Sequence, residues 1–258
     1  MNENNNFVEY YKEHSISDQS LRRFQGIRDS ILYILTHLKR NSTNISVADI
    51  GCNAGTQMFL WSTENNNVYG VDINYDLVQL ALERARKKQH DVQLCVGSAS
   101  SLSWKDSQMD VCLLPELLEH VVDWKNTINE AIRVLNDSGV IFISTTNVLC
   151  PIQAEFNLPL YSWYPKRLKK YYEKLSVTSR PELVCFAKYP AVHWFSYYQL
   201  RKYFKAYGFD VLDRFDILDM KTSKGTKKIL IKLVRMNQIF RFLGHLFTPY
   251  TVIVAFKK

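Results

Sequence analysis

The spacing of apolar residues changes period several times along the chain, and each change marks an expected element. Apolar residues recur every three or four positions over 18–40, which predicts an amphipathic helix. Short apolar runs then alternate with helical segments, a pattern that predicts a parallel sheet covered by helices on both faces. The expected strands lie at 45–50, 67–72, 92–96, 109–114 and 140–144, and the expected helices at 56–62, 77–86 and 124–135.

The alternation stops over 147–193, where Tyr, Pro and Lys are frequent and no period is clear. We interpret this stretch as an insertion of the kind that forms a lid or a substrate wall in enzymes. After it, the pattern predicts a helix at 197–206, a strand at 210–217 and a final strand at 251–256.

Composition narrows the class of protein. With 47% hydrophobic residues and only nine Gly and seven Pro in 258 residues, the chain is neither disordered nor collagen-like. The first residues lack a basic segment followed by an apolar run, and no apolar stretch is long enough to span a bilayer, so we expect no secretory signal and no membrane span. The five cysteines stand singly, which favours free thiols and a cytoplasmic protein.

The net charge of +8 belongs to the C-terminal segment. Nine of the 33 Lys and Arg residues lie within 221–258, where there is no Asp or Glu, so positions 1–220 are nearly neutral. A nucleic-acid partner is therefore disfavoured, whereas an anionic membrane surface or an acidic partner could meet this segment alone.

A basic stripe lies within 227–245. The spacing predicts one amphipathic helix with apolar residues on the opposite face, a type that lies in membrane interfaces. The alternative is an ordinary helix that packs its apolar residues on the sheet and exposes the basic ones. The stripe consists of Lys228, Lys232, Arg235, Gln238, Arg241 and His245.

The segment 47–56, VADIGCNAGT, has the composition of a strand, a tight turn and the start of a helix. Gly51 and Gly55 lack a Cβ, which lets a ligand approach the backbone closely. Asp72, at the end of the next expected strand, stands where a carboxylate binds the ribose hydroxyls of a nucleoside. Because Asp49 adds an acid to the turn, a cationic ligand suits it better than a pyrophosphate. Taken alone, the glycine pattern also fits a plain strand–helix turn.

Four motifs in order give the chain a family resemblance. They are Asp49-Ile-Gly-Cys-Asn-Ala-Gly55, Asp72, Gly97-Ser-Ala-Ser100 and Glu116-Leu-Leu-Glu-His-Val121. Together they resemble the class I S-adenosylmethionine-dependent methyltransferases, nearest to the group of ubiquinone-biosynthesis O-methyltransferases. The resemblance covers about 25–147 and, more loosely, 193–217. It implies a Rossmann-like, doubly wound α/β fold with a seven-stranded sheet, mostly parallel, in which the last strand is antiparallel.

The resemblance also implies which residues hold S-adenosyl-L-methionine. The acids, glycines and neighbours of the turn would surround the methionine part, Asp72 the ribose, and the residues after the third strand the adenine. Asn53, where many relatives have Gly, is the departure from the family pattern. The implied set is Arg28, Asp49, Gly51, Cys52, Gly55, Asp72, Ile73, Ser98, Ala99, Leu114 and Pro115.

The acidic motif after the fourth strand offers two catalytic hypotheses. If it is helical, Glu116, Glu119 and His120 share one face. His120 could deprotonate a substrate hydroxyl, since its pKa lies near working pH. The resemblance instead implies that the three hold a divalent cation such as Mg²⁺. A third interpretation is that Glu119 and His120 simply pair within the fold. His193 is a second candidate base.

We therefore expect one methyltransferase domain over 1–258, with N-terminal helices at 1–44, a cofactor-binding core at 45–146, a substrate-side insertion at 147–193 and the C-terminal part of the sheet at 194–258. The expected reaction is O-methylation of a small-molecule or lipid-linked acceptor, by an enzyme in the cytoplasm or peripheral to the inner face of the membrane. The alternatives are a nucleic-acid or protein N-methyltransferase and a non-catalytic S-adenosylmethionine-binding module. The first is disfavoured because Leu114-Pro-Glu-Leu117 replaces the Asn/Asp-Pro-Pro-Tyr type of motif.

Overall fold

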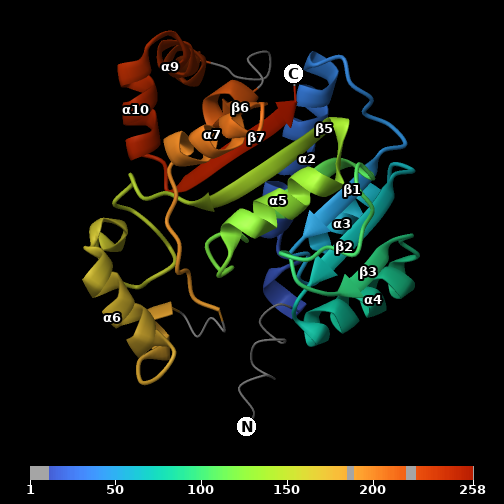
Figure 1. Ribbon diagram of the computed structural model, residues 1–258, viewed down its shortest axis with the longest axis horizontal. Coiled ribbons are helices and arrows are strands. Elements are labelled where there is room, and N and C mark those ends of the chain that lie inside the picture. Colours follow the sequence, from blue (N-terminus) through green and yellow to red (C-terminus); the bar gives the residue numbers. More distant parts are fainter. Residues whose placement is uncertain (1–11, 185–188, 219–224, 258) are drawn as a thin grey trace. The chain divides into compact units, whose positions relative to one another are not determined.

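A computed structural model describes residues 12–184, 189–218 and 225–257 (Figure 1). It divides into two compact units. Unit 1 comprises residues up to Pro115, Asp123–Phe142 and Lys257, and unit 2 comprises Glu116–Val122 and Ile143–Phe256. Within the described ranges, no helix is both long enough and apolar enough to cross a membrane.

The seven strands form one mixed sheet, mostly parallel, in the order β3-β2-β1-β4-β5-β7-β6, with helices on both sides. This confirms the predicted Rossmann-like fold. The strands are β1 (Ser46–Ile50), β2 (Asn67–Asp72), β3 (Gln93–Val96), β4 (Met109–Pro115), β5 (Leu135–Thr146), β6 (Phe209–Asp213) and β7 (Tyr250–Lys257).

The parallel strands of unit 1 are formed by short continuous runs of apolar residues. β1 pairs in parallel with β2 and with β4, and four of its five residues are buried, which is typical of a strand covered on both faces. The chain order reverses between β1 and β4, and in open α/β sheets ligands bind outside the carboxyl ends of the strands at such a point. The helices of unit 1 are α2 (Asp18–His37), α3 (Thr56–Ser62), α4 (Tyr75–Lys88) and α5 (Trp124–Val134).

Unit 2 holds the predicted insertion and the basic segment. The insertion contains a regular helix that the sequence pattern did not predict, α6 (Lys166–Ser176), packed on the short turn η2 (Pro181–Val184). Its aromatic residues largely pack together: Tyr161 is fully buried and stacks on Phe156, with ring centroids 4.0 Å apart. This part of the insertion therefore has a small core of its own.

The expected strand at 210–217 is wrong in its second half. β6 ends at Asp213, and α8 (Arg214–Ile217) follows. Asp213 is the N-cap residue of α8: its Oδ1 accepts from the backbone N–H of Phe215, and the Asp216 carboxylate accepts from the N–H of Asp213. This capping box satisfies the first N–H groups of a helix, which is why the extended chain stops here.

The basic segment forms two helices rather than one. α9 (Gly225–Met236) ends before Asn237, whose side chain accepts from the N–H of Ile239 and so caps α10 (Gln238–Leu246). The two helices pack side by side (Figure 1). At the contact with α8, a Cβ on Gly244 would lie 2.6 Å from the Phe215 ring, so only glycine permits this approach. The remaining helix of unit 2 is α7 (Tyr197–Ala206).

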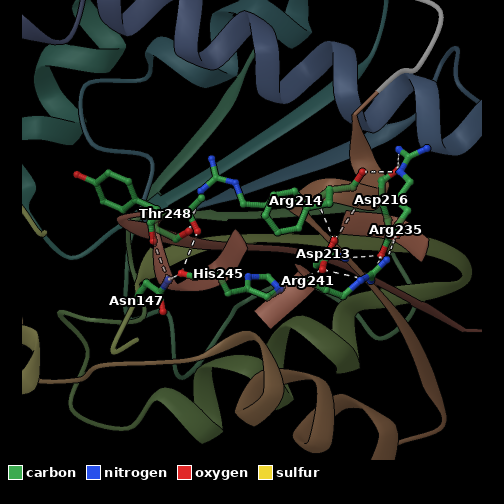
Figure 2. A network of polar contacts seen from close by, with 10 residues as sticks. Asn147, Asp213, Arg214, Asp216, Arg235, Arg241, His245 and Thr248 are labelled. Atoms are coloured by element: carbon green, nitrogen blue, oxygen red, sulfur yellow. Dashed lines mark hydrogen bonds and ion pairs between the residues drawn. The ribbon is translucent and has the colours of Figure 1, made fainter. Parts of the chain in front are cut away.

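A polar network fastens α10 to β6 and α8 (Figure 2). The buried Asp213 carboxylate accepts from His245 Nε2 at 3.0 Å and pairs with Arg241 at 3.2 Å, while Arg241 makes a two-pronged contact with Asp216. Burial alone raises the pKa of Asp213, but the His245 hydrogen bond and the Arg241 charge outweigh it, so the pKa is lowered. Asp213 is therefore a charged group that the network stabilises.

We expect Asp213→Ala to lower the free energy of unfolding by about 3–5 kcal/mol, because it leaves Arg241 undercompensated and His245 without its acceptor. Urea unfolding followed by circular dichroism measures this. Ionised Asp213 stabilises the folded protein at pH values above the pKa that this group has in the unfolded chain. This stabilisation is lost as the pH falls through its lower pKa in the folded protein, so the wild type should lose stability in acid more steeply than the variant. The exposed Asp137→Ala is the matched control, and an equal loss in both variants contradicts the role given to the network.

Candidate active site

The turn after β1 is built from left-handed backbone. Gly51, Asn53 and Gly55 have φ of 80°, 46° and 79°, a conformation that favours glycine and tolerates asparagine. The N–H groups of Gly51 and Cys52 both donate to the carbonyl of Val71 in β2, at 2.8 and 3.0 Å. The turn is thereby fixed to the end of the neighbouring strand, and Cys52 itself is buried.

Gly55 serves packing as well as the turn. A Cβ at this position would lie 2.8 Å from the ring of Phe59 and 3.1 Å from the Cβ of Ala81 on α4. The direction of the missing Cβ is occupied by these side chains, and the approach of a ligand to the Gly55 backbone stays a prediction. Gly55 lets α3 begin close to α4.

Asp72 joins two turns. Its Oδ2 accepts from the backbone N–H of Asn53 at 2.9 Å, and its Oδ1 accepts from the N–H of Asn74 at 2.8 Å. Burial raises the pKa of Asp72, and these two backbone donors oppose the rise. The carboxylate is held rigidly at the end of β2, where a ribose would meet it.

Asp49 is a buried acid without a donor among the residues that the structure describes. It is 1% exposed, and within the described ranges neither carboxyl oxygen has a hydrogen-bond partner. Burial, together with the nearby Asp72, raises its pKa to about 8. Buried polar groups in proteins are almost always hydrogen-bonded, so a buried carboxyl group without a partner indicates a place where a ligand binds. A positively charged group is the partner that a buried carboxylate requires.

Two further side chains near the turn share this property. The Thr56 hydroxyl and the Gln57 amide, in the first turn of α3, are buried, and no described residue gives either a hydrogen-bond partner. Sequence reasoning missed both, because only burial distinguishes an orphan Gln from one that faces solvent. Together with Asp49 they mark the start of α3 as the place where polar ligand atoms are needed.

The ends of β2 and β3 carry exposed apolar side chains. Ile73, which follows β2, is 64% exposed, and Val96, the last residue of β3, is 48% exposed. Because Asp72 pairs with Val96 in the sheet, the two apolar side chains end neighbouring strands and could flank a planar base. Ile73 belongs to the predicted set, and Val96 is an addition from the structure.

The loop after β3 brings polar groups to the same edge. The Ser98 hydroxyl lies 2.9 Å from that of Ser100, whose carbonyl accepts from Asn126 on α5 at 2.6 Å. Ala99 is half-buried between them. The residues predicted to lie beside the adenine thus belong to a loop that hydrogen bonds hold in place. At the end of β4, Leu114 is fully buried and Pro115 is half-buried.

Arg28 is not brought to the turn. Its guanidinium donates to the carbonyl of Leu60 and pairs with Glu64 at 3.2 Å, both at the C-terminal end of α3. The glycine turn lies at the opposite end of this helix. The structure instead places Arg84 of α4 at the turn, where it donates to the carbonyl of Ala54 at 3.3 Å.

The predicted catalytic residues lie in unit 2, and their expected helix is wrong. Residues 116–122 form turns, and Glu116, directly after β4, has a φ of 53°. Glu119 is fully buried and accepts from the Thr145 hydroxyl at 2.8 Å. The turn arises because the N–H of Glu116 continues the ladder to the Ser144 carbonyl, after which the backbone reverses.

The three residues do not fit a metal. Burial, and secondarily the charge of Glu155, raise the pKa of Glu119 well above its usual range, so it is a neutral acid rather than an anionic ligand. Among the residues that the structure describes, no group of three or more His, Cys, Asp and Glu side chains is arranged to hold a metal ion. The site implied for Mg²⁺ is therefore not formed.

His120 forms part of the wall of an open cavity of about 530 Å³ in unit 2. Burial lowers its pKa, with partial opposition from backbone groups of Tyr189 and Pro190, so the imidazole is neutral near pH 7. Its Nε2 lies 4.0 Å from Glu155, a half-buried acid whose pKa is raised to about 7 by desolvation and by the charge of Glu116. The cavity is lined further by Val122, Lys170, Glu173, Lys174, Val177, Tyr189, Pro190 and Val192.

His193 is held as a structural residue. Its Nε2 lies 3.1 Å from the carbonyl oxygen of Val122, and because a carbonyl can only accept, this nitrogen donates. Its backbone N–H donates to the carbonyl of Glu119 at 3.2 Å. Both contacts tie the end of the insertion to the turn that carries His120.

Comparison with known proteins decides the family. Residues 41–205 match the model of a family described as a methyltransferase domain. The chain belongs to this family. It is a class I S-adenosylmethionine-dependent methyltransferase, and the orphan acid Asp49 and the fixed carboxylate Asp72 fit the cationic methionine part and the ribose of that cofactor.

Individual relatives agree with this assignment. The ubiquinone biosynthesis O-methyltransferase of Pelagibacter ubique is 30% identical over 128 residues, which is 47% of this chain and 52% of that protein. This chain spans about half the length of the curated relatives it matches.

Two solved structures share the fold. The PH0226 protein of Pyrococcus horikoshii has a TM-score of 0.57 at 18% identity, covering 97% of this chain and 99% of that one. The magnesium protoporphyrin IX methyltransferase of Synechocystis, solved with bound S-adenosylhomocysteine, has a TM-score of 0.54 at 14% identity, covering 99% and 100%.

Asp72→Ala should weaken binding of S-adenosylmethionine by about 1–3 kcal/mol, because the ribose hydroxyls lose a fixed acceptor. Isothermal titration calorimetry measures the change. Asp76→Ala, an exposed acid four residues further on, is the control that removes the same charge. Equal affinity of wild type and Asp72→Ala would show that Asp72 does not touch the cofactor.

Cofactor binding should release a proton near neutral pH. With a pKa of about 8, Asp49 is protonated in the free protein, and it must ionise to pair with the positively charged cofactor. Between pH 6 and pH 7 we therefore expect the affinity to rise by about tenfold with pH. Titration in two buffers of different ionisation enthalpy detects the proton. In Asp49→Asn both the proton release and this pH dependence should disappear, and their persistence would assign them to another group.

Proposed function

We propose that this methyltransferase methylates a hydroxyl oxygen of a small or lipid-linked acceptor, with His120 as the general base. The observation that carries the proposal is the neutral His120 in the wall of the open cavity of unit 2. A hydroxyl needs a base for its proton as it attacks a methyl group, whereas a neutral amine can attack before losing one.

The cavity suits an acceptor with both apolar and polar parts. Three valines and Pro190 supply apolar wall, and Tyr189 adds an aromatic ring. Lys170, Glu173 and Lys174 of α6 contribute charged side chains of both signs at the same cavity. The names of the relatives, O-methyltransferases of ubiquinone biosynthesis, support the same class of acceptor.

In this proposal, one set of residues holds the cofactor and another set, His120 and Glu155, handles the proton of the acceptor. When bound, S-adenosylmethionine would supply an electrophilic methyl group and leave as S-adenosylhomocysteine. Asp72 and Asp49 of unit 1 would hold its ribose and its cationic part. His120 takes the hydroxyl proton, and Glu155, 4.0 Å away, stabilises the imidazolium that forms once this acid is ionised. Positioning of acceptor and methyl group contributes much of the remaining rate.

We expect His120→Ala to lower kcat by about 10²–10⁴-fold while cofactor affinity stays unchanged. Transfer of labelled methyl from S-adenosylmethionine to phenols, catechols and prenylated phenols measures the activity. His193→Ala is the matched histidine control: because its Nε2 donates to a carbonyl, kcat should fall far less. A larger loss in His193→Ala than in His120→Ala contradicts the proposal, and cofactor binding without transfer to any hydroxylated acceptor points to a binding module.

Glu155→Gln tests the support of His120. In the wild type, kcat should rise as pH passes about 7, because Glu155 ionises there and stabilises the imidazolium. In Glu155→Gln this step in the pH–rate profile should be absent, with a lower plateau above pH 7. Retention of the step assigns it to another group.

A further inference from the structure

The α9–α10 hairpin, residues 225–246, exposes most of its large apolar residues. Met236 is 82% exposed, and Phe247, directly after α10, is 74% exposed. So many exposed large apolar side chains on one pair of helices are uncommon on proteins that work alone in water. We call these nine side chains the apolar face: Ile229, Leu230, Leu233, Met236, Ile239, Phe240, Phe242, Leu243 and Phe247.

Three polar residues of the hairpin point into unit 2, together with the buried apolar Ile231 and Val234. Arg235 donates to the carbonyls of Phe215, Asp216 and Leu218, at 2.7–3.1 Å, and so satisfies the end of α8. Arg241 and His245 are fastened to Asp213 and Asp216 in the network of Figure 2. The hairpin is therefore anchored to unit 2 by these polar contacts while many of its large apolar side chains face outward.

The network also fixes this orientation. Asn147, at the end of β5, donates to the carbonyls of His245 and Thr248, both at 2.7 Å. Arg214 donates to the carbonyl of Tyr250 at 3.0 Å. To bury the apolar face against unit 2, the hairpin would have to break these contacts and leave Asp213 without its partners. The apolar face is thus held outward.

The charges beside the apolar face have one sign. Lys228 and Lys232 are exposed on α9, one turn apart and next to Ile229 and Leu233. From 221 to 258 the sequence contains no acid. A second copy of the chain would bring an equally basic edge against this one, whereas anionic headgroups above an acyl layer complement both the charge and the apolar side chains.

We propose that the apolar face of the α9–α10 hairpin inserts into the interface of an anionic phospholipid bilayer, with Lys228 and Lys232 contacting headgroup phosphates. The enzyme then works at a membrane surface as a peripheral protein. The proposal rests on the hairpin and not on the identity of the methyl acceptor.

Vesicle flotation of the full chain tests the proposal, with vesicles of phosphatidylglycerol and phosphatidylcholine in equal amounts. The wild type should float with these vesicles and much less with pure phosphatidylcholine. Met236→Glu/Phe247→Glu should weaken binding by at least about thirtyfold, because it removes two apolar anchors. Lys228→Glu/Lys232→Glu should weaken it by about thirtyfold, and high salt should reduce it in the wild type.

Matched controls carry the same changes elsewhere. Ile16→Glu/Tyr207→Glu places two acids at other exposed apolar positions, and Lys87→Glu/Lys88→Glu reverses two exposed lysines of α4. Both should float like the wild type. Calorimetric titration with S-adenosylmethionine checks that each variant is folded, and if the apolar variant does not fold, the lysine variant decides.

Three results would overturn the proposal. The first is that the wild type does not float with anionic vesicles. The second is that the two hairpin variants float as well as the controls. The third is that the wild type does not bind vesicles but forms a dimer in sedimentation velocity, and that Met236→Glu/Phe247→Glu dissociates this dimer. The last result assigns the apolar face to a second copy of the chain.

Discussion

The carboxylate of Asp72 is the constraint on which the cofactor side depends. One oxygen accepts from the turn after β1 and the other from the turn after β2, so two loops that are far apart in sequence hold one geometry. The same placement raises the pKa of Asp49, already raised by burial, because two buried acids end adjacent strands. The fold thus places two acids close together, an arrangement that a positively charged ligand would stabilise.

Much of this arrangement could be predicted because it is encoded locally. β2 was predicted with its exact bounds, since an apolar run between polar segments has few other ways to fold. Asp49, Gly51 and Asp72 are predicted as cofactor-side residues from their positions near strand ends. Gln57 and Val96 are not, because the signal that singles them out is burial for Gln57 and exposure for Val96. Both properties depend on the packing of distant segments rather than on the residues themselves.

The errors arise where a tertiary contact overrides a local pattern. Glu116, Glu119 and His120 have helical spacing, but the N–H of Glu116 bonds to Ser144 on a distant strand and the chain turns instead. The metal site implied by resemblance fails for the same reason, since the turn buries Glu119 as a neutral acid. In 227–245 the periodicity was recognised, but periodicity does not say which face turns inward.

Which face of the hairpin turns inward is decided by buried groups that need hydrogen-bond donors, more than by the burial of apolar side chains. α8 leaves carbonyl groups at its end, and Asp213 places a charge at a buried position, so the surrounding surface needs several donors. Arg235, Arg241 and His245 supply them from one face of the hairpin, and the opposite, apolar face is left outside as a consequence. A buried network of charged groups can specify orientation even where it adds little net stability. On this argument, the outward apolar face is a specified feature of the fold and not a failure of packing.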